Sequence, residues 1–446
     1  MKLWQTLLSV FKTGRFSPSW RRSRLGWLAI ALVVCGSILF SGLSAFTQEK
    51  VSVSFLVRSL EVDQLEALEQ EFESQNPDID LELIRGPNAA DAVENLYTTS
   101  FLLGDSPYDI VYSDVVWIPK FAAAGWLRDL SDRVSEADLD VFLKADVEAG
   151  RYQGGFYRMP FRSDMGMLYY RTDLLEQAGL EPPNTFEELQ ETAKTLQEQG
   201  QVPWGFSWQG KQYEGLATVF VEAIAGYGGF WVNPETLEVG LDSPAGYQAV
   251  EFLRDLIAQN ITPPGVTNYI EEDALRLFEN GNAVFMRNWP YAWAQVNRAE
   301  ATVQGKVGLK PMVHAPNENS AACLGGWGFA ISATTPHPEE AWRVVEFLTS
   351  RESQKKFTLE FSYVPSRRDL FTDAEVLAKY SHYQALLQVA DSTVPRPPVG
   401  QYAQVSDILQ RYLSAALTNQ ISPEDAMNAA AGETRRVLGR SVAEPS

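Results

Sequence analysis

The hydrophobic pattern of the first part of the chain changes its period several times. Residues 51–57 alternate and then run apolar, which predicts a buried strand, and the apolar positions that follow at helical spacing stop before Pro77. Alternation returns at 79–83, a helical pattern covers 93–103, and an apolar run at 109–112 predicts a third strand. Strands that alternate with helices in this way predict an α/β lobe.

The later part of the chain is predicted to be mostly helical, and its helix starts are well marked. Each has a side-chain acceptor or a proline in the first turn: Thr185 with Glu188 as a capping box, Ser243-Pro244, His337-Pro338 and Ser422-Pro423. A chain of 446 residues is too long for one ordinary core. Because no internal repeat and no Gly/Ser-rich or Pro-rich linker divides it, we expect two domains that exchange segments.

The N-terminus has the charge order of an export signal. Residues 1–24 contain Lys and Arg but no acidic residue, and residues 25–46 are apolar. Since positive flanks stay cytoplasmic, we expect the rest of the chain on the periplasmic, extracytoplasmic face of the inner membrane. The apolar stretch is long enough to span a bilayer, so cleavage of residues 1–48 and their retention as an anchor both stay open.

Cys35 lies inside this apolar stretch, after a run of about the length found in lipoprotein signals. Val34 stands where a lipobox usually has a small residue, so we expect Cys35 to be buried in the membrane, with lipidation as the alternative. Cys323 is the other cysteine, and this pair cannot build a disulfide framework. The histidines have no metal-binding spacing and no neighbouring nucleophile motif, so we expect no metal and no cofactor.

The part of the chain after residue 48 is strongly acidic. The sequence contains 57 acidic and 37 basic side chains, with a formal net charge of −20, and every acidic residue follows Gln48. Such a surface repels phosphate backbones and anionic membranes, whereas a neutral solute is indifferent to it. The charge therefore argues against a nucleic-acid partner, and solubility is its simplest explanation.

Aromatic residues make up 12% of the sequence, which suits either a large core or a surface that stacks on flat apolar faces. A neutral sugar needs carboxylates that accept from its hydroxyls, an Arg that donates and an aromatic ring against its apolar face. Asp114 ends an apolar strand, and Asp164 lies at an expected crossing between lobes; both are candidate ligands. A turn or helix cap is the alternative for Asp114, and a salt bridge to Arg162 or Arg171 is the alternative for Asp164.

Three further segments present aromatic or basic side chains. Trp289 precedes a proline, which predicts a stacking platform, with core packing as the alternative. Trp327 follows Gly325 and Gly326, which allow close backbone approach and a positive φ; a tight turn with a packing Trp is the alternative. Arg396 is held extended between prolines, and a solvated loop Arg is its alternative.

Several weaker candidates complete the set. Glu61 follows the first predicted strand, where a charge at a helix start needs no ligand. Tyr213, Phe230 and Trp231 are aromatic candidates for lining a cleft, and a packed turn is the alternative for the last two. Trp293 is expected in the core.

Five segments carry a set of motifs that are specific in combination. They are Tyr-Ser-Asp-Val-Val-Trp at 112–117, Ser-Asp-Met-Gly-Met-Leu-Tyr-Tyr-Arg-Thr-Asp-Leu-Leu at 163–175, Met-Arg-Asn-Trp-Pro-Tyr-Ala-Trp at 286–293, Gly-Gly-Trp-Gly at 325–328 and Tyr-Val-Pro-Ser-Arg at 363–367. With these motifs, nearly all of residues 50–435 resembles the family 1 sugar-binding proteins of ABC importers, especially their trehalose/maltose-binding branch. The resemblance implies a periplasmic-binding-protein-like α/β fold of the maltose-binding, type II kind, with two α/β lobes, a hinge and an interlobe cleft.

The resemblance also implies domain boundaries and a binding site. Lobe 1 would comprise residues 50–161 and 317–363, and lobe 2 would comprise residues 162–316 and 364–446. The implied ligand contacts are Glu61, Asp114, Asp164, Trp289, Tyr291, Gly325, Gly326, Trp327 and Arg396.

The function implied by the resemblance is that of a monomeric solute-binding component, not an enzyme. It would close on a neutral disaccharide or glycoside of the trehalose, maltose, sucrose or glucosylglycerol class and deliver it to ABC permease subunits. Arg162 departs from the Tyr expected before the Ser-Asp pair, which leaves the sugar itself open. The alternatives are an exported carbohydrate hydrolase that uses Asp114 and Asp164 as paired carboxylates, and an anchored scaffold without a small ligand.

Overall fold

The computed structural model describes residues 50–104, 106–233, 235–390 and 393–442. The described residues from 52 onward form one compact unit. The expected signal or anchor and Cys35 lie outside the described residues. Within the described ranges, no helix has the length and apolar character needed to cross a membrane.

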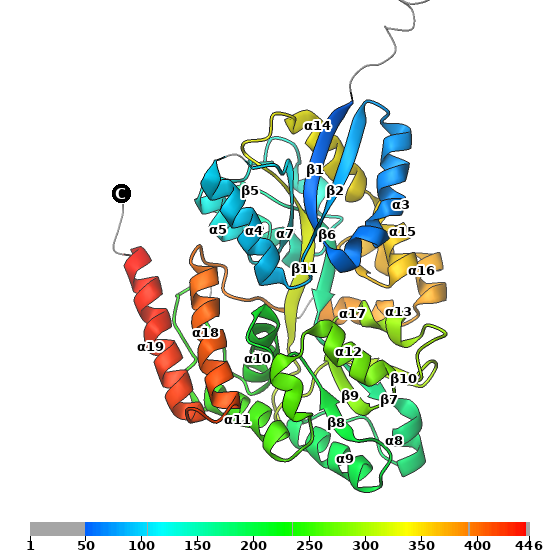
Figure 1. Cartoon of the computed structure of the whole chain (residues 1–446), viewed down its shortest axis with the longest axis vertical. Coiled ribbons are helices and arrows are strands. Elements are labelled where there is room, and N and C mark those ends of the chain that lie inside the picture. Colours follow the sequence, from blue (N-terminus) through cyan, green and yellow to red (C-terminus); the bar gives the residue numbers. More distant parts are fainter. Residues whose placement is uncertain (1–49, 105, 234, 391–392, 443–446) are drawn as a thin grey trace, which may run out of the picture. The chain divides into compact units, whose positions relative to one another are not determined.

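The N-terminal part of this unit alternates strands and helices, as predicted. It consists of β1 (Val51–Arg58), α3 (Ser59–Gln75), β2 (Ile79–Gly86), α4 (Ala90–Leu103) and β3 (Ile110–Asp114). α3 buries Leu65, Leu68 and Phe72 on one face and ends where the Asn76 side chain donates to the Phe72 carbonyl at 2.9 Å. These elements, coloured from blue to cyan in Figure 1, lie together with the yellow α14 (Pro338–Leu348) at one end of the body.

The sheet that carries the candidate residues is built around β11 (Ala322–Ile331), which is buried along its whole length. β11 pairs antiparallel with β3 and with β6 (Met159–Met165), and parallel with β13 (Thr393–Val394). β12 (Val364–Pro365) extends the sheet beside β6. The register sets Trp327 opposite Asp114 on one side and opposite Arg162 on the other. Segments far apart in the sequence therefore meet at β11.

A second sheet has four strands in the order β10-β7-β9-β8. They are β7 (Met167–Arg171), β8 (Trp204–Ser207), β9 (Ala283–Asn288) and β10 (Val307–Lys310). The chain passes from the first sheet to the second at Gly166, where an added Cβ would lie 1.7 Å from Oε1 of Glu222. The boundary expected after residue 161 falls inside β6.

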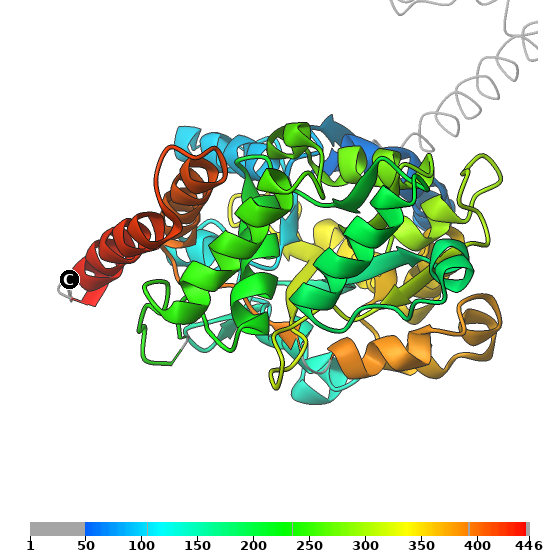
Figure 2. The same ribbon diagram turned by 90° about the horizontal axis from the view of Figure 1, so that it is seen from below.

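Helices cover this second sheet and extend the body on one side. They are α8 (Thr172–Ala178), α9 (Phe186–Glu198), α10 (Glu214–Gly226), α11 (Pro244–Ala258), α12 (Glu271–Glu279), α13 (Ala292–Val296), α18 (Tyr402–Leu417) and α19 (Pro423–Val442). α18 and α19 pack against each other and against α11, and both views show the pair at the edge of the body (Figures 1 and 2).

The predicted helix starts are confirmed. Thr185 accepts from the Glu188 N–H at 3.1 Å and forms the capping box, and Ser243 and Ser422 also accept a first-turn N–H. His337 makes no side-chain cap, so the proline after it marks that start alone. The remaining elements are α5 (Ile118–Ala123), α6 (Glu136–Leu139), α7 (Lys144–Glu148), β4 (Arg151–Tyr152), β5 (Gly155–Phe156), η2 (Pro264–Asn268), α15 (Arg351–Phe361), η3 (Arg368–Thr372), α16 (Ala374–Lys379) and α17 (Tyr383–Ala390).

Candidate functional site

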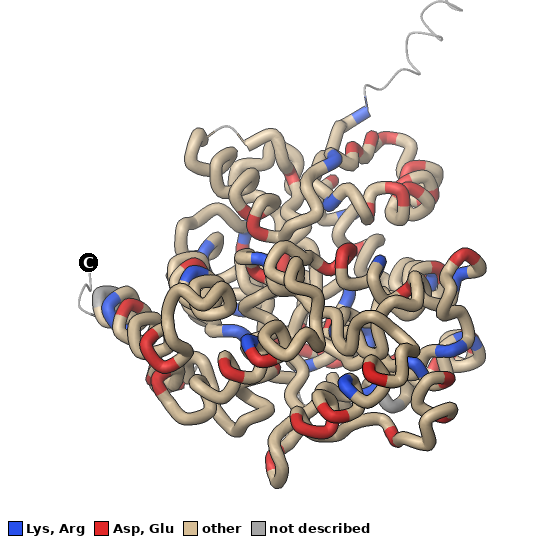
Figure 3. Tube along the Cα trace, turned by 60° about the horizontal axis from the view of Figure 1, so that its bottom comes forward, with Lys and Arg blue, Asp and Glu red and all other residues tan. Residues whose placement is uncertain are grey.

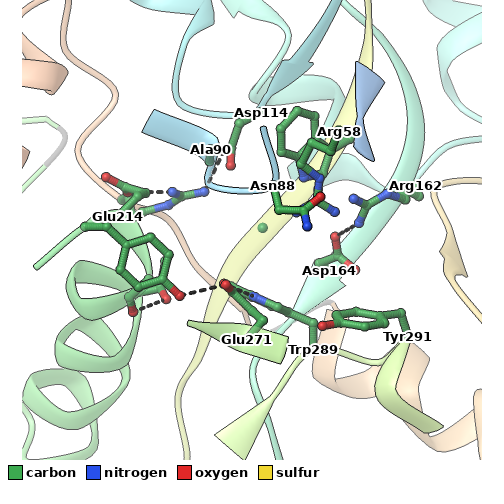
Figure 4. Close-up of a pocket in the computed structure, with 17 residues that line it drawn as sticks. Arg58, Asn88, Ala90, Asp114, Arg162, Asp164, Glu214, Glu271, Trp289 and Tyr291 are labelled. Carbon is green, nitrogen blue, oxygen red and sulfur yellow. Dashed lines mark hydrogen bonds and ion pairs between the residues drawn. The ribbon is translucent and has the colours of Figure 1, made fainter. Parts of the chain in front are cut away.

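A cavity lies where these elements converge. Its lining includes all but one of the predicted ligand contacts: Asp114, Asp164, Trp289, Tyr291, Gly325, Gly326, Trp327 and Arg396. Glu61 does not line it and is fully buried. Figure 4 shows the labelled side chains converging on this space from different elements.

The two glycines of β11 let neighbouring groups approach the strand closely. An added Cβ at Gly325 would lie 3.1 Å from both the Trp289 ring and the Asp164 Cβ. Gly326 has a φ of 136°, a conformation that favours glycine, and its added Cβ would lie 2.7 Å from the Arg162 carbonyl. The structure places both glycines in a strand, so the tight turn weighed as the alternative is wrong.

Arg396 links two acidic side chains at one wall of the cavity. Its Nη2 donates to Asp114 at 2.7 Å, and its Nη1 donates to Glu214 at 2.6 Å. Tyr402 and Ser406 of α18 also donate to Glu214, which fixes this carboxylate from behind. Arg396 is buried, so the solvated loop Arg weighed as its alternative is wrong. Asp114 ends β3, as expected for a side chain delivered to a cavity.

Trp289 follows the end of β9 and is held in one orientation. Its Nε1 donates to Glu271 at 3.2 Å, and the Tyr213 hydroxyl donates to the other oxygen of Glu271 at 2.6 Å. The Arg287 guanidinium lies 4.0 Å from the centroid of the Trp289 ring, and the fully buried Arg287 is itself paired with Glu222. A half-buried indole that lines the cavity and is backed by a fixed cation is a preorganised stacking surface.

A network of two arginines and two carboxylates forms another wall. Glu61 accepts from Arg58 and, at 2.6 Å, from Arg162, and Arg162 also donates to Asp164. Burial acts to raise the pKa of Glu61, but Arg162 and Arg58 outweigh it and lower that pKa to about 2. Burial raises the pKa of the Asp164 carboxyl to about 6, although Arg162 and Arg58 act against it. The ion pair between Arg162 and Asp164 is present, and Asp164 lines the cavity as well.

Trp327 reaches the cavity but is only 4% exposed. Tyr112 and Trp117 pack against its ring, with centroids 4.9 and 5.3 Å away. The Arg58 guanidinium lies over the same ring, 4.8 Å from its centroid. Tyr291 stacks on Tyr363, and the Tyr291 hydroxyl has no partner among the described residues. Tyr291 was implied only by the family resemblance.

The other aromatic candidates divide between cavity and core. Tyr213, a candidate from the sequence for lining a cleft, does line the cavity. Phe230 and Trp231 are absent from the cavity lining; Trp231 is buried, and its ring packs 5.9 Å from that of Tyr402. Trp293 also lies away from the lining and packs on His382, with centroids 4.7 Å apart.

Three of the lining residues that were not predicted from the sequence are charged. Arg58 ends a strand, Glu214 begins a helix and Glu271 begins another, positions at which charges are common without function. The sequence around each of them shows only that the residue is the first or last of a helix or strand. Across the described chain, acidic and basic positions are interspersed (Figure 3), and no group of three or more described His, Cys, Asp or Glu side chains could hold a metal ion.

Solved structures share this architecture. The structure described as maltose-bound MalE3 of T. maritima has a TM-score of 0.83 and 38% sequence identity to this chain, covering 87% of this chain and 99% of its own. This likeness confirms the predicted maltose-binding-protein-like fold, with two α/β lobes, a hinge and an interlobe cleft.

Sequence relatives lead to a family. A probable ABC transporter-binding protein of Deinococcus radiodurans is 33% identical over 368 residues, which cover 81% of this chain and 87% of the relative. The maltotriose-binding protein of Pyrococcus abyssi is 26% identical over 330 residues, which cover 73% of this chain and 68% of the relative. Residues 59–355 match the family described as bacterial extracellular solute-binding protein. This chain therefore belongs to the family of bacterial extracellular solute-binding proteins.

Proposed function

We propose that this chain is the solute-binding component of an ABC importer and that its ligand is a neutral disaccharide or glycoside of the trehalose, maltose, sucrose or glucosylglycerol class. The observation that carries the proposal is the cavity itself. It combines one fixed indole, Trp289, with hydrogen-bonding carboxylates and guanidiniums on the facing walls.

The charges around the cavity favour a neutral ligand over an anion. The three guanidiniums in the lining, those of Arg58, Arg162 and Arg396, are each paired with a carboxylate. A phosphate would bring negative charge to guanidiniums whose charge carboxylates already balance, and an uncompensated charge is costly in a buried site. A hydroxyl-rich neutral solute needs neither change, because it both donates and accepts.

The relatives support the carbohydrate class. The similar T. maritima structure is described as bound to maltose, and the Pyrococcus abyssi relative is described as binding maltotriose. By the same reasoning we place the chain on the extracytoplasmic face of the membrane, as a monomer that delivers its sugar to permease subunits. No step in this scheme is catalytic.

The proposed mechanism is closure of two lobes over the sugar. Lobe 1 is taken as residues 50–161 with 317–363, and lobe 2 as residues 162–316 with 364–446. Asp114 then belongs to lobe 1 and Trp289 to lobe 2, so that a shared ligand stabilises the closed form. Small-angle scattering is expected to show a saturable fall in the radius of gyration when sugar is added, and binding without any change would contradict closure.

Calorimetric titration of the purified residues 50–446 tests the ligand class. Maltose, trehalose, sucrose and glucosylglycerol are compared with glucose 6-phosphate, and at least one neutral sugar is expected to bind saturably while the phosphate does not. Prolonged incubation is expected to return the sugar unchanged, whereas hydrolysis would support the exported hydrolase. Failure of every sugar to bind would reject the proposed ligand class.

A further inference from the structure

The wall formed by Trp327 does not present a bare aromatic ring. Trp327 is only 4% exposed, and the Arg58 guanidinium lies over its ring. The Arg58 side chain is 13% exposed and lines the cavity. An arginine stacked on an indole is held by cation–π attraction while the edge of its guanidinium stays available for hydrogen bonds.

Arg58 is anchored from behind by a buried carboxylate. Its Nη2 donates to Oε1 of Glu61, which is fully buried and also accepts from Arg162 at 2.6 Å. Nε of Arg58 is buried and has no partner among the described residues, and the hydrogen bond that Arg58 donates to Glu61 comes from Nη2. One end of the guanidinium is therefore fixed, and the other keeps donors for a bound solute.

An unused acceptor belongs to the same network. Oδ2 of Asp164 accepts from Arg162, while Oδ1 is buried and has no partner among the described residues. Figure 4 shows Asp164 and Arg58 on the Arg162 side of the cavity, and both line it. A donor beside an acceptor complements two neighbouring hydroxyls, one of which accepts while the other donates.

We propose that Arg58 is a specificity-determining residue for the solute, and that its guanidinium, not the Trp327 ring, meets the sugar at this wall. Nη1 of Arg58 donates to one sugar oxygen, and Oδ1 of Asp164 accepts from a neighbouring hydroxyl. This assignment rests on the proposed function, because it takes the solute to be a sugar. It divides the cavity into a stacking end at Trp289 and a polar end at Arg58.

Calorimetry with the best neutral sugar of the panel tests the assignment. Arg58→Lys keeps the charge beside Glu61 but loses the planar fork, and we expect binding to weaken on the order of 10- to 100-fold. Arg85→Lys is the matched control, since Arg85 is exposed and pairs with Asp63 at the surface; its affinity is expected to be unchanged. Binding by Arg58→Lys within about twofold of the unsubstituted protein would overturn the proposal.

A double variant separates solute contact from a purely structural role. Arg58→Met removes one of the two cations that pair with the Glu61 carboxylate. Adding Glu61→Gln removes the negative charge that this cation balances. If Arg58 only balanced Glu61, the double variant would regain the affinity of the unsubstituted protein; we expect it to stay weak while its melting temperature recovers.

Monodeoxy sugars supply a third readout. One deoxy analogue, which lacks the oxygen that accepts from Arg58, is expected to bind the unsubstituted protein and Arg58→Lys equally well. If every deoxy analogue binds Arg58→Lys more weakly than the unsubstituted protein by the same factor as the parent sugar does, Arg58 does not contact the solute. Failure of the unsubstituted protein to bind any sugar would reject the proposed function, and the assignment with it.

Discussion

The Asp91 carboxylate accepts the backbone N–H of Glu214, at 3.1 Å to one oxygen and 3.2 Å to the other. Asp91 lies in the first turn of α4, and Glu214 is the first residue of α10, whose N-cap residue provides no side-chain bond. A side-chain acceptor from one helix therefore caps the start of another. Their neighbours Ala90 and Gly215 line the cavity, so this contact closes part of its wall.

Removing this cap is expected to destabilise the protein. Asp91→Ala leaves the start of α10 without a side-chain acceptor, and we expect the free energy of unfolding to fall by about 1 kcal/mol. Asp91→Asn keeps one acceptor oxygen and should lose less. Urea denaturation measures both, with Asp63→Ala at an exposed ion pair as the control that should change little.

Stability is expected to fall as the pH rises toward neutrality. Burial, with the nearby Glu214, raises the pKa of Asp91 from 3.8 to about 7, and burial raises the pKa of Asp146 by a similar amount and that of Glu272 from 4.5 to about 7. Because these folded-state values exceed the unfolded ones, the folded protein binds more protons between about pH 4 and pH 7, and its free energy of unfolding decreases across that window.

The lowered pKa of Glu61 acts in the opposite sense. Its contribution is present above the unfolded value of 4.5 and is lost as the pH falls toward about 2. The melting temperature without sugar should therefore be highest in the mildly acidic range, and Asp91→Asn should flatten the decline toward neutral pH. A melting temperature that rises steadily from about pH 5 to about pH 8 would contradict these assignments.

Trp289→Ala should weaken sugar binding by about 1 to 3 kcal/mol, because it removes the preorganised stacking surface. Trp293→Ala is the matched control, since Trp293 packs on His382 outside the cavity lining. Titration calorimetry compares the two variants. An equal loss of sugar affinity in both variants would mean that Trp289 packs in the core and does not contact the ligand.

The ion pair of Arg287 and Glu222 supports the Trp289 platform from inside the protein. Both side chains are almost fully buried. Nε of Arg287 donates to the Glu222 carboxylate at 2.8 Å, and Nη2 of Arg287 donates to it at 2.5 Å. Arg287→Met leaves Glu222 buried without its cation, and we expect a loss of about 3 to 5 kcal/mol in unfolding free energy. The double variant Arg287→Met with Glu222→Leu should recover much of that loss in urea denaturation, because no buried charge remains unpaired.

Much of the local structure and about half of the cavity lining could be predicted from the sequence. The period of apolar residues around Leu65 and Phe72 predicted α3, and the Thr185 and Ser243 caps predicted the starts of α9 and α11. Such signals are local, because a helix face repeats within a few residues and a cap acts within one turn. The motif resemblance, not periodicity, singled out residues such as Tyr291.

The partners of the charged side chains were decided only by the tertiary structure. Glu61 was expected to face the ligand, but Arg162, 101 residues away, and Arg58 enclose it in a buried network. Arg396 donates to Asp114, which is 282 residues away in the sequence, and no local pattern in either segment predicts this pairing. A charge at an element end has the same sequence signature whether it faces solvent, a ligand or an opposite charge, because its environment comes from segments that only the folded chain brings together.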